Sequence, residues 1–409
     1  MKIFKFLAVA LVAMVGLNSC SKDCDHDFID VDHSADLVGT WTCFEAGYAE
    51  ALVIKADGSV VSTGVEDGEY WDGVKGNIVV KNGTVTMTFE DGDNFKGHFD
   101  IVPGVAFSIF TEDGKHITYN YCKEDLSEEV VGMWLCTQTP SGKSEDMLIQ
   151  NFQEDGTLIT TGRVPEADDY IVNANSNYKV FGDLYIIYGK EEGTALVFKF
   201  NVSSNETTLG KMMTVTGFMP TENGVVEETS SWLRVKQSLN LANKTYDYSS
   251  AYVTNVNGKD EDFSIMGHTF NIANLKAGDF DIMMRSELFC LETNANLIKY
   301  NFVLDNGQNA ELDVPISVES NKVTLDMSAA APGLRKVEVY MFQDADDSQL
   351  HMYMHTDAFI NYFANLEIVT LLSEGKIDLT DAAAIEKVFT DMEARVESIN
   401  VSFVMKVRK

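Results

Sequence analysis

The sequence has little positive charge and little proline, and it lacks the familiar motifs of catalysis. Its 409 residues include 31 basic and 63 acidic side chains, which give a formal net charge of −32. Segments 20–36, 37–126, 127–237 and 238–409 are each net acidic, so each would repel a nucleic-acid backbone. Six prolines exclude a proline-rich chain, and 45% hydrophobic residues exclude wholesale disorder. We expect a folded, acidic protein of roughly two to four domains that binds no nucleic acid.

Catalytic motifs are absent from the whole sequence. It contains no Gly-x-Ser-x-Gly elbow, no His-Glu-x-x-His and no glycine-rich phosphate loop. His351 and His355 have the spacing of a zinc site on a helix, but the residues around them alternate as in a strand. Four strand positions span about 13 Å, so these two are expected to be surface histidines that share no ion. We expect no catalytic residue, no metal and no cofactor, and therefore no enzyme.

Long hydrophobic runs are missing except at the N-terminus. Lys2 and Lys5 precede an apolar run over 6–17, too short to span a bilayer comfortably and typical of a signal peptide. The run ends in Leu17-Asn18-Ser19-Cys20, which resembles the lipobox of bacterial lipoproteins. That resemblance implies a signal peptide over 1–19 and a lipid on Cys20 as the only membrane attachment. The alternative is an ordinary secretory signal with an incidental cysteine.

An acidic tether over 20–36 follows the predicted lipid. Ser21-Lys22-Asp23-Cys24-Asp25 resembles the export signal of Bacteroidetes surface lipoproteins. This implies an outer-membrane protein that faces the cell exterior, with the periplasmic face as the alternative. The composition of the tether predicts a flexible spacer.

Five cysteines remain if Cys20 carries lipid, so at least one is unpaired in a monomer. Cys43 is expected on the first strand of the first domain and Cys122 on its last. In a closed barrel these strands are neighbours, so a disulfide and two buried free thiols are both open.

The body of the chain contains a tandem repeat. Leu37-Val38-Gly39-Thr40-Trp41-Thr42-Cys43 matches Val130-Val131-Gly132-Met133-Trp134-Leu135-Cys136, and Asp57-Gly58 matches Asp155-Gly156. Within each copy, short alternating runs are separated by turn signals at a spacing of roughly 8–12 residues. This pattern predicts antiparallel sandwiches or barrels.

The Gly-x-Trp start, the up-and-down strands and a closing basic residue resemble lipocalin-like β-barrel domains. The resemblance covers about 37–123 and 130–236, which lie in domain 1 over 37–126 and domain 2 over 127–237. It implies that each tryptophan lies at the base of a barrel under a basic side chain. The implied pairs are Trp41 with Lys123 and Trp134 with Arg234.

The third segment, 238–409, lacks Gly-x-Trp but remains rich in strand patterns. Apolar residues at spacings of three and four predict helices near 357–373 and 381–398, and Gly375 should end the first. A strand that includes Val401, Phe403, Met405 and Val407 should follow. We expect a mainly β chain of tandem antiparallel lipocalin-like barrels, followed by a calycin-like β-rich domain with two late helices.

The function expected from these features is non-catalytic binding of a small or apolar ligand. Nine of the 17 methionines lie in 238–409, and methionine suits adaptable surfaces. Met352, Tyr353 and Phe363 are therefore candidate ligand-binding residues, if the first late helix is a lid and does not simply plug the domain. The alternative is a structural or interaction lipoprotein with filled barrels, such as a binder of a host or envelope protein or a peptidase inhibitor.

Overall fold

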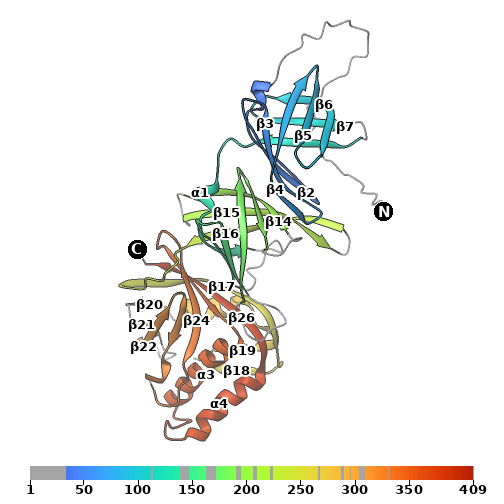
Figure 1. Cartoon of the computed structure of the whole chain (residues 1–409). Coiled ribbons are helices and arrows are strands. Elements are labelled where there is room, and N and C mark those ends of the chain that lie inside the picture. Colours follow the sequence, from blue (N-terminus) through green and yellow to red (C-terminus); the bar gives the residue numbers. More distant parts are fainter. Residues whose placement is uncertain are drawn as a thin grey trace.

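The computed structural model describes most of the chain beyond the tether. The described residues are 34–111, 114–138, 147–162, 172–189, 195–205, 210–221, 224–265, 268–286, 290–294, 296–303, 309–329 and 331–408. They form three closed antiparallel barrels of eight strands each. In Figure 1 the barrels follow one another in a row, from blue through green to red. The predicted fold class is confirmed, and the third segment is itself a closed barrel.

The first barrel begins after the short helix η1 (Ser34–Leu37) and is a simple up-and-down meander. Its strands are β1 (Gly39–Glu45), β2 (Tyr48–Ile54), β3 (Ser59–Glu66), β4 (Glu69–Lys81), β5 (Thr84–Phe89), β6 (Asn94–Val102), β7 (Ala106–Thr111) and β8 (His116–Tyr121). β1 pairs with β8 and closes the barrel.

The second barrel repeats this plan after the helical turn α1 (Ser127–Val130). Its strands are β9 (Gly132–Gln138), β10 (Leu148–Phe152), β11 (Thr157–Gly162), β12 (Val172–Phe181), β13 (Leu184–Tyr188), β14 (Ala195–Asn205), β15 (Gly210–Thr221) and β16 (Gly224–Val235). β16 pairs with β9 and closes the barrel.

The third barrel closes through pairing of β17 (Lys244–Gly258) with β26 (Val396–Val407). Between them come β20 (Cys290–Thr293), β21 (Leu297–Val303), β22 (Asn309–Glu319), β23 (Lys322–Leu325), β24 (Val337–Gln343) and β25 (Gln349–Met354). The other elements are a two-stranded sheet of β18 (Asp262–Ile265) and β19 (His268–Asn271), the short helices η2 (Ile272–Asn274) and η3 (Met327–Ala329), and the α-helices α2 (Ala277–Ser286), α3 (Thr356–Ser373) and α4 (Ala382–Arg395).

The late helices lie close to their predicted positions. α3 ends just before Gly375, whose φ of +67° is the left-handed conformation that commonly follows a helix. α4 ends at Arg395, whereas the sequence pattern extended it to 398. From Val396 onward the chain pairs with β17, and β-branched residues such as Val396 and Val401 suit a strand.

The two Gly-x-Trp motifs form the same structure at the bases of the first and second barrels. Trp41 and Trp134 are fully buried, and each indole Nε1 donates a 2.7 Å hydrogen bond to the carbonyl four residues earlier, in Leu37 and Val130. Gly39 and Gly132 have φ angles of +138° and +130°. A β-carbon would lie 2.6 Å from the Tyr121 ring at the first site and 2.8 Å from the Arg234 guanidinium at the second. Glycine is therefore required there for both conformation and space.

The third barrel is filled by its own helix. Phe359 and Phe363 of α3 are 1% exposed and belong to the apolar cluster inside the barrel. The Phe363 ring lies 5.7 Å from Phe280 of α2 and 6.2 Å from Phe270 of β19. α3 is thus a packed plug.

Contacts between neighbouring barrels join them into one elongated body. The Tyr70 ring of the first barrel stacks on Tyr188 of the second at 4.5 Å, and Lys179 forms a 2.5 Å ion pair with Asp72. Between the second and third barrels, Leu135 and Leu233 belong to one apolar cluster with Phe342 and Tyr353.

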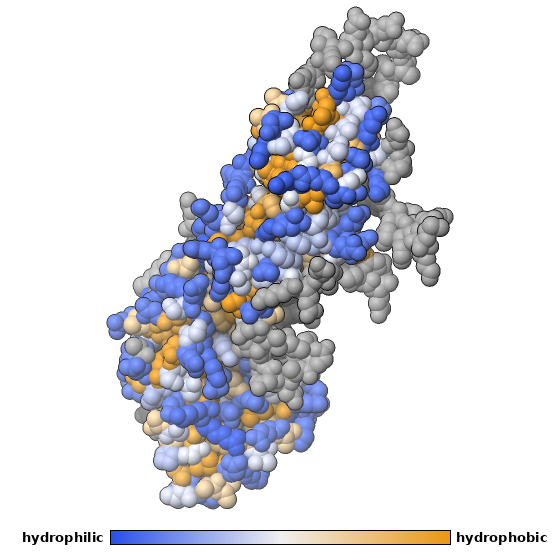
Figure 2. All heavy atoms as spheres, viewed as in Figure 1, coloured by the Kyte–Doolittle hydropathy of each residue, from blue (hydrophilic) through white to orange (hydrophobic). Residues whose placement is uncertain are grey.

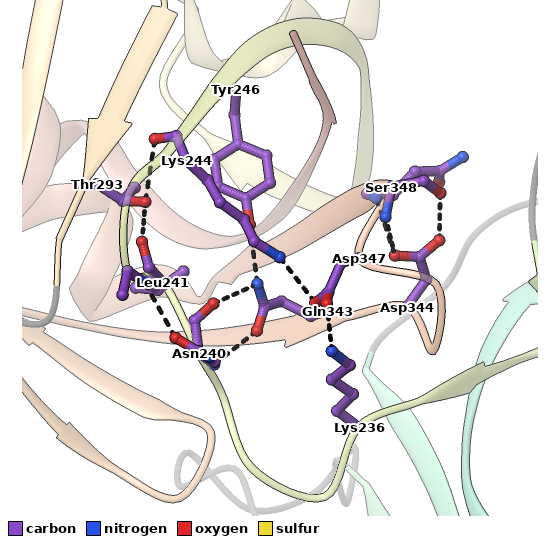
Figure 3. Close-up of polar contacts among 12 residues, drawn as sticks. Lys236, Asn240, Leu241, Lys244, Tyr246, Thr293, Gln343, Asp344, Asp347 and Ser348 are labelled. Atoms are coloured by element: carbon purple, nitrogen blue, oxygen red, sulfur yellow. Dashed lines mark hydrogen bonds and ion pairs between the residues drawn. The ribbon is translucent and has the colours of Figure 1, made fainter. Parts of the chain in front are cut away.

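Polar contacts reinforce the second junction (Figure 3). Lys236 and Lys244 both form ion pairs with Asp347, at 2.5 and 2.8 Å. The Gln343 side chain donates to the Tyr246 hydroxyl at 2.8 Å and accepts from the Asn240 amide at 2.6 Å. Since Gln343 is fully buried, this satisfied network fixes the linker against the third barrel.

Candidate functional site

The first barrel contains an open cavity of about 390 Å³. Specific small-molecule sites are typically clefts of about 300–1,000 Å³ with a few convergent polar groups. The lining residues are Tyr48, Glu50, Ser62, Glu66, Trp71, Val74, Met87, Phe89, Asp91, Asp93, Asn94, Phe95, Lys115, Ile117 and Tyr119. The cavity opens at the end of the barrel away from Trp41, beside the strand ends that carry Glu66, Asp91 and Lys115.

Two other hollows are less suited to bind a ligand. One, of about 490 Å³, lies against β3, β4 and β5 and is lined by exposed residues such as Lys55, Lys75 and Glu90. The other, of about 360 Å³, is a groove between the second and third barrels. The face drawn in Figure 2 is mainly hydrophilic, with scattered apolar areas. The cavity in the first barrel is distinguished by its buried polar floor.

A buried carboxylate forms the floor of this cavity. Glu50 is 6% exposed, and its two oxygens accept hydrogen bonds from three hydroxyl groups. Ser62 donates at 2.5 Å and Tyr48 at 2.6 Å, and Tyr119 donates to the oxygen that Tyr48 also contacts. The donors come from strands β3, β2 and β8. The network therefore ties together strands that meet on one side of the barrel.

Trp71 extends this network into the wall of the cavity. Its indole Nε1 donates to the Ser62 hydroxyl at 2.7 Å, and its ring centre lies 6.2 Å from that of Tyr48. A β-carbon on Gly64 would lie 2.4 Å from the Trp71 ring. Glycine at this position of β3 therefore gives the indole room to reach Ser62.

Burial dominates the electrostatics of this group. Desolvation raises the pKa of Glu50, and the hydroxyl hydrogen bonds from Ser62, Tyr119 and Tyr48 oppose this rise. Desolvation, together with the nearby Glu50 carboxyl, raises the pKa of the Tyr48 and Tyr119 hydroxyls. The floor is thus a carboxyl group whose charged form is costly unless a further partner stabilises it.

The sequence did not predict this site, because its methionines indicated the third domain. The signal lay in β2, where Tyr48, Leu52 and Ile54 alternate and face the core. Glu50 occupies the position between Tyr48 and Leu52 on that same face. A glutamate on the core side of a strand is rarely buried without a partner, so this pattern could have indicated a site.

The predicted barrel-base pairs differ between the two repeats. The Arg234 guanidinium lies 5.6 Å from the centre of the Trp134 ring, and it donates a 2.5 Å hydrogen bond to the Val131 carbonyl. In the first barrel, Tyr121 occupies the equivalent register position and packs edge-on against Trp41 at 4.9 Å. The predicted Trp41–Lys123 pair is wrong, because β8 ends at Tyr121 and Lys123 beyond it is exposed.

The candidate ligand residues of the third domain are packed. Met352 and Phe363 are 1% exposed and belong to the interior cluster of the third barrel. Tyr353 points the other way, into the apolar cluster shared with the second barrel, where it borders the groove of about 360 Å³. Neither Met352 nor Phe363 is among the residues that line the three hollows described above, and their burial against described residues fits the plug interpretation of the first late helix.

His351 and His355 are not surface histidines. They flank Tyr353 and are 6% and 7% exposed, although the predicted strand is present as β25. β25 is covered on both sides, by the plug and by the second barrel, so its outward residues are buried too. Desolvation lowers the pKa of His351 to about 4.

The structure bears on the open question of the cysteines in the first barrel. Cys43, Cys122 and Cys136 are free thiols, and Cys122 is only half-buried. The signal peptide and Cys20 lie outside the described residues.

Within the described ranges, no group of three or more His, Cys, Asp or Glu side chains is arranged to hold a metal ion. No helix among those residues is both long enough and apolar enough to cross a bilayer.

Comparison with known proteins assigns this chain to no family. The sequence matches no known protein family and no curated protein. Among solved structures, it is similar to a mutant of transferrin binding protein B, a vaccine antigen from Haemophilus parasuis, with 10% identity and a TM-score of 0.21. That match covers 88% of this chain and 66% of the other. A porin-like protein from Bacteroides uniformis matches with 9% identity and a TM-score of 0.14, over 47% of this chain and 94% of the other. Likenesses this distant assign no function.

Replacing Glu50 with glutamine should change how stability depends on pH. The pKa of Glu50 is higher in the folded chain than in the unfolded chain, where it is about 4.3. The carboxyl therefore destabilises the fold progressively as the pH rises from the unfolded-state pKa to the folded-state pKa. Glutamine cannot ionise, so we expect Glu50→Gln to gain stability relative to the natural chain over that window. Urea unfolding at several pH values, followed by hydrogen exchange in β2 and β3, measures the difference. Glu69→Gln, on an exposed position of β4, corrects for the lost charge. A difference that is constant across pH would contradict the assignment.

Proposed function

We propose that this chain is a lipid-anchored, non-catalytic binding protein that holds a small ligand in its first barrel. The single observation that supports this most strongly is the open cavity of about 390 Å³ over the buried Glu50 network. Its walls combine aromatic rings with a few convergent polar groups, as ligand sites do. The anchor rests on the predicted lipid at Cys20, and display on the outer face rests on the acidic residues that follow.

The alternative role, a protein-binding or structural lipoprotein, requires filled barrels. As far as their described residues go, the second and third barrels fit that description. The interior of the second contains Trp134, Phe152, Tyr185 and Trp232, and the third contains its plug helix. The first barrel does not fit it, because its cavity remains open above Glu50. We therefore assign binding to the first barrel and a supporting role to the other two.

Filling the cavity should abolish binding without unfolding the barrel. Val74 lines the cavity and pairs with Ser62 across β3 and β4. Val74→Trp would place a large ring over the polar floor. Val79→Trp is the matched control, because Val79 lies on the same strand and is 58% exposed.

Native mass spectrometry of the chain from Ser21 to Lys409, purified from its own host, tests the proposal. We expect a mass increment from a copurified small molecule in the natural chain and in Val79→Trp, and none in Val74→Trp. An increment that Val74→Trp retains would show that the ligand binds elsewhere. A natural chain free of any small molecule would favour the structural role.

A further inference from the structure

Among the described residues, Glu50 has hydrogen-bond donors but no positively charged partner. Three hydroxyls donate to its two oxygens, and in the part of the chain that the structure describes no lysine or arginine forms an ion pair with it. A buried carboxylate is ordinarily neutralised by protonation or by a cation. Donors that converge on both oxygens orient the group and favour its ionised form. The site is therefore a carboxyl group whose hydrogen-bond donors are in place and whose ionised form still requires a cation.

The second barrel shows that this arrangement is not needed to build the fold. Glu50 pairs with Gly64 across β2 and β3, and Leu148 pairs with Gly162 at the same place in the second barrel. Trp232 similarly occupies the register position of Tyr119, two residues before the residue that pairs with the base tryptophan. In the second barrel the same arrangement of strands thus carries Leu148 in place of Glu50 and Trp232 in place of Tyr119. Apolar replacement of a buried charged group is often stabilising. The first barrel keeps a costly carboxylate at the floor of its open cavity.

The remaining surfaces of the cavity are suited to an organic cation. Aromatic rings line the walls above Glu50, and aromatic faces attract ammonium groups. These rings belong to Tyr48, Trp71, Phe89 and Phe95. Three acidic residues, Glu66, Asp91 and Asp93, accompany a single basic one, Lys115, among the lining residues nearer the mouth. Such an imbalance raises the local concentration of cations and repels anions.

We propose that the first barrel binds a small organic amine whose ammonium group lies against Glu50 and whose apolar body lies against Trp71 and the neighbouring rings. This inference rests on the proposed function, since it names the ligand class of the same cavity. The ammonium supplies the charge that the hydroxyl network lacks. Its binding converts Glu50 from a destabilising group into half of a hydrogen-bonded ion pair.

Three ligands with the same aromatic scaffold test the proposal by isothermal titration calorimetry on the chain from Ser21 to Lys409. Phenethylamine, 2-phenylethanol and 3-phenylpropionate share a ring and a two-carbon linker, and they differ in the charge of the head group. We expect phenethylamine to bind roughly tenfold or more tightly than the alcohol, because a charge-assisted hydrogen bond to a buried carboxylate is about twice as strong as a neutral one. The carboxylate ligand should bind most weakly.

Two variants test whether Glu50 causes the preference for the amine over the alcohol. Glu50→Gln should reduce the amine affinity to about that of the alcohol, a loss of roughly tenfold, while leaving the alcohol nearly unchanged. Glu69→Gln, whose side chain lies outside the cavity, should keep the preference. The comparison of the three ligands needs no variant, so it is decisive even if Glu50→Gln does not fold.

Equal affinities for amine and alcohol, tighter binding of the carboxylate ligand, or no binding of any of the three would overturn the amine inference. The proposed function fails separately, if Val74→Trp retains the copurified molecule. A neutral or anionic ligand that Val74→Trp excludes would therefore refute the amine and leave the binding function standing.

Discussion

Replacing Cys20 with alanine should release the protein from the membrane fraction and abolish its labelling by a radioactive fatty acid. The predicted lipid is the only attachment in this account, and the buried hydrocarbon of an anchor supplies about 0.8 kcal/mol per methylene. Without it, a chain of net charge −32 has nothing to hold it on an anionic membrane surface.

Cys24→Ala is the matched control, because it removes a thiol four residues further along the same tether. We expect this variant to stay membrane-bound and labelled. Retention of both properties by Cys20→Ala would show that the leader is an ordinary secretory signal or that another segment anchors the chain.

Replacing Trp134 with alanine should destabilise the second barrel by about 3–5 kcal/mol, as removal of a large buried aromatic usually does. The ring is fully buried at the barrel base, its indole satisfies the Val130 carbonyl, and the Arg234 guanidinium covers it at 5.6 Å. The substitution leaves a cavity, an unpaired carbonyl and an arginine without its aromatic partner. Urea unfolding followed by hydrogen exchange in β9 and β16 measures the loss.

Arg234→Ala should cost about 1–2 kcal/mol, because it removes the cation–π contact and the hydrogen bond to Val131. Lys123→Ala, at the end of the first barrel, should change stability by less than about 0.5 kcal/mol, since that lysine is exposed. Equal losses of stability in Arg234→Ala and Lys123→Ala would contradict the difference between the bases of the first and second barrels. Unchanged stability of Trp134→Ala would remove the packing argument altogether.

The place of each tryptophan at a barrel base could be predicted from sequence because local rules determine it, whereas the side chain that packs against it could not, since Tyr121 and not Lys123 packs against Trp41. Gly-x-Trp recurs at matching positions, and one glycine conformation and one indole hydrogen bond reproduce the base in both copies. The turns at Gly58 and Gly156 follow in the same way, with φ angles of +82° and +84°. Alternation and turn signals thus sufficed to predict the antiparallel β class of the fold.

The ligand cavity could not be located by the same rules. Whether a barrel is open or filled depends on contacts between distant strands and helices, such as Phe363 of α3 against Phe280 of α2. The methionines of the third segment indicated an adaptable surface, but Met352 is enclosed by that plug. Nor could the sequence show that the second barrel covers the outer side of β25, which buries His351. The Glu50 network likewise joins β2 and β3 to Tyr119 of β8, which reaches them only when the barrel closes.

A crystal structure of the chain purified from its own host tests the central claim most directly. We predict electron density for a small molecule between Glu50 and Trp71, with the third barrel filled by α3. Ligand density in the groove beside Tyr353, or a first barrel in which its own side chains occupy the volume above Glu50, would contradict the assignment of the binding site.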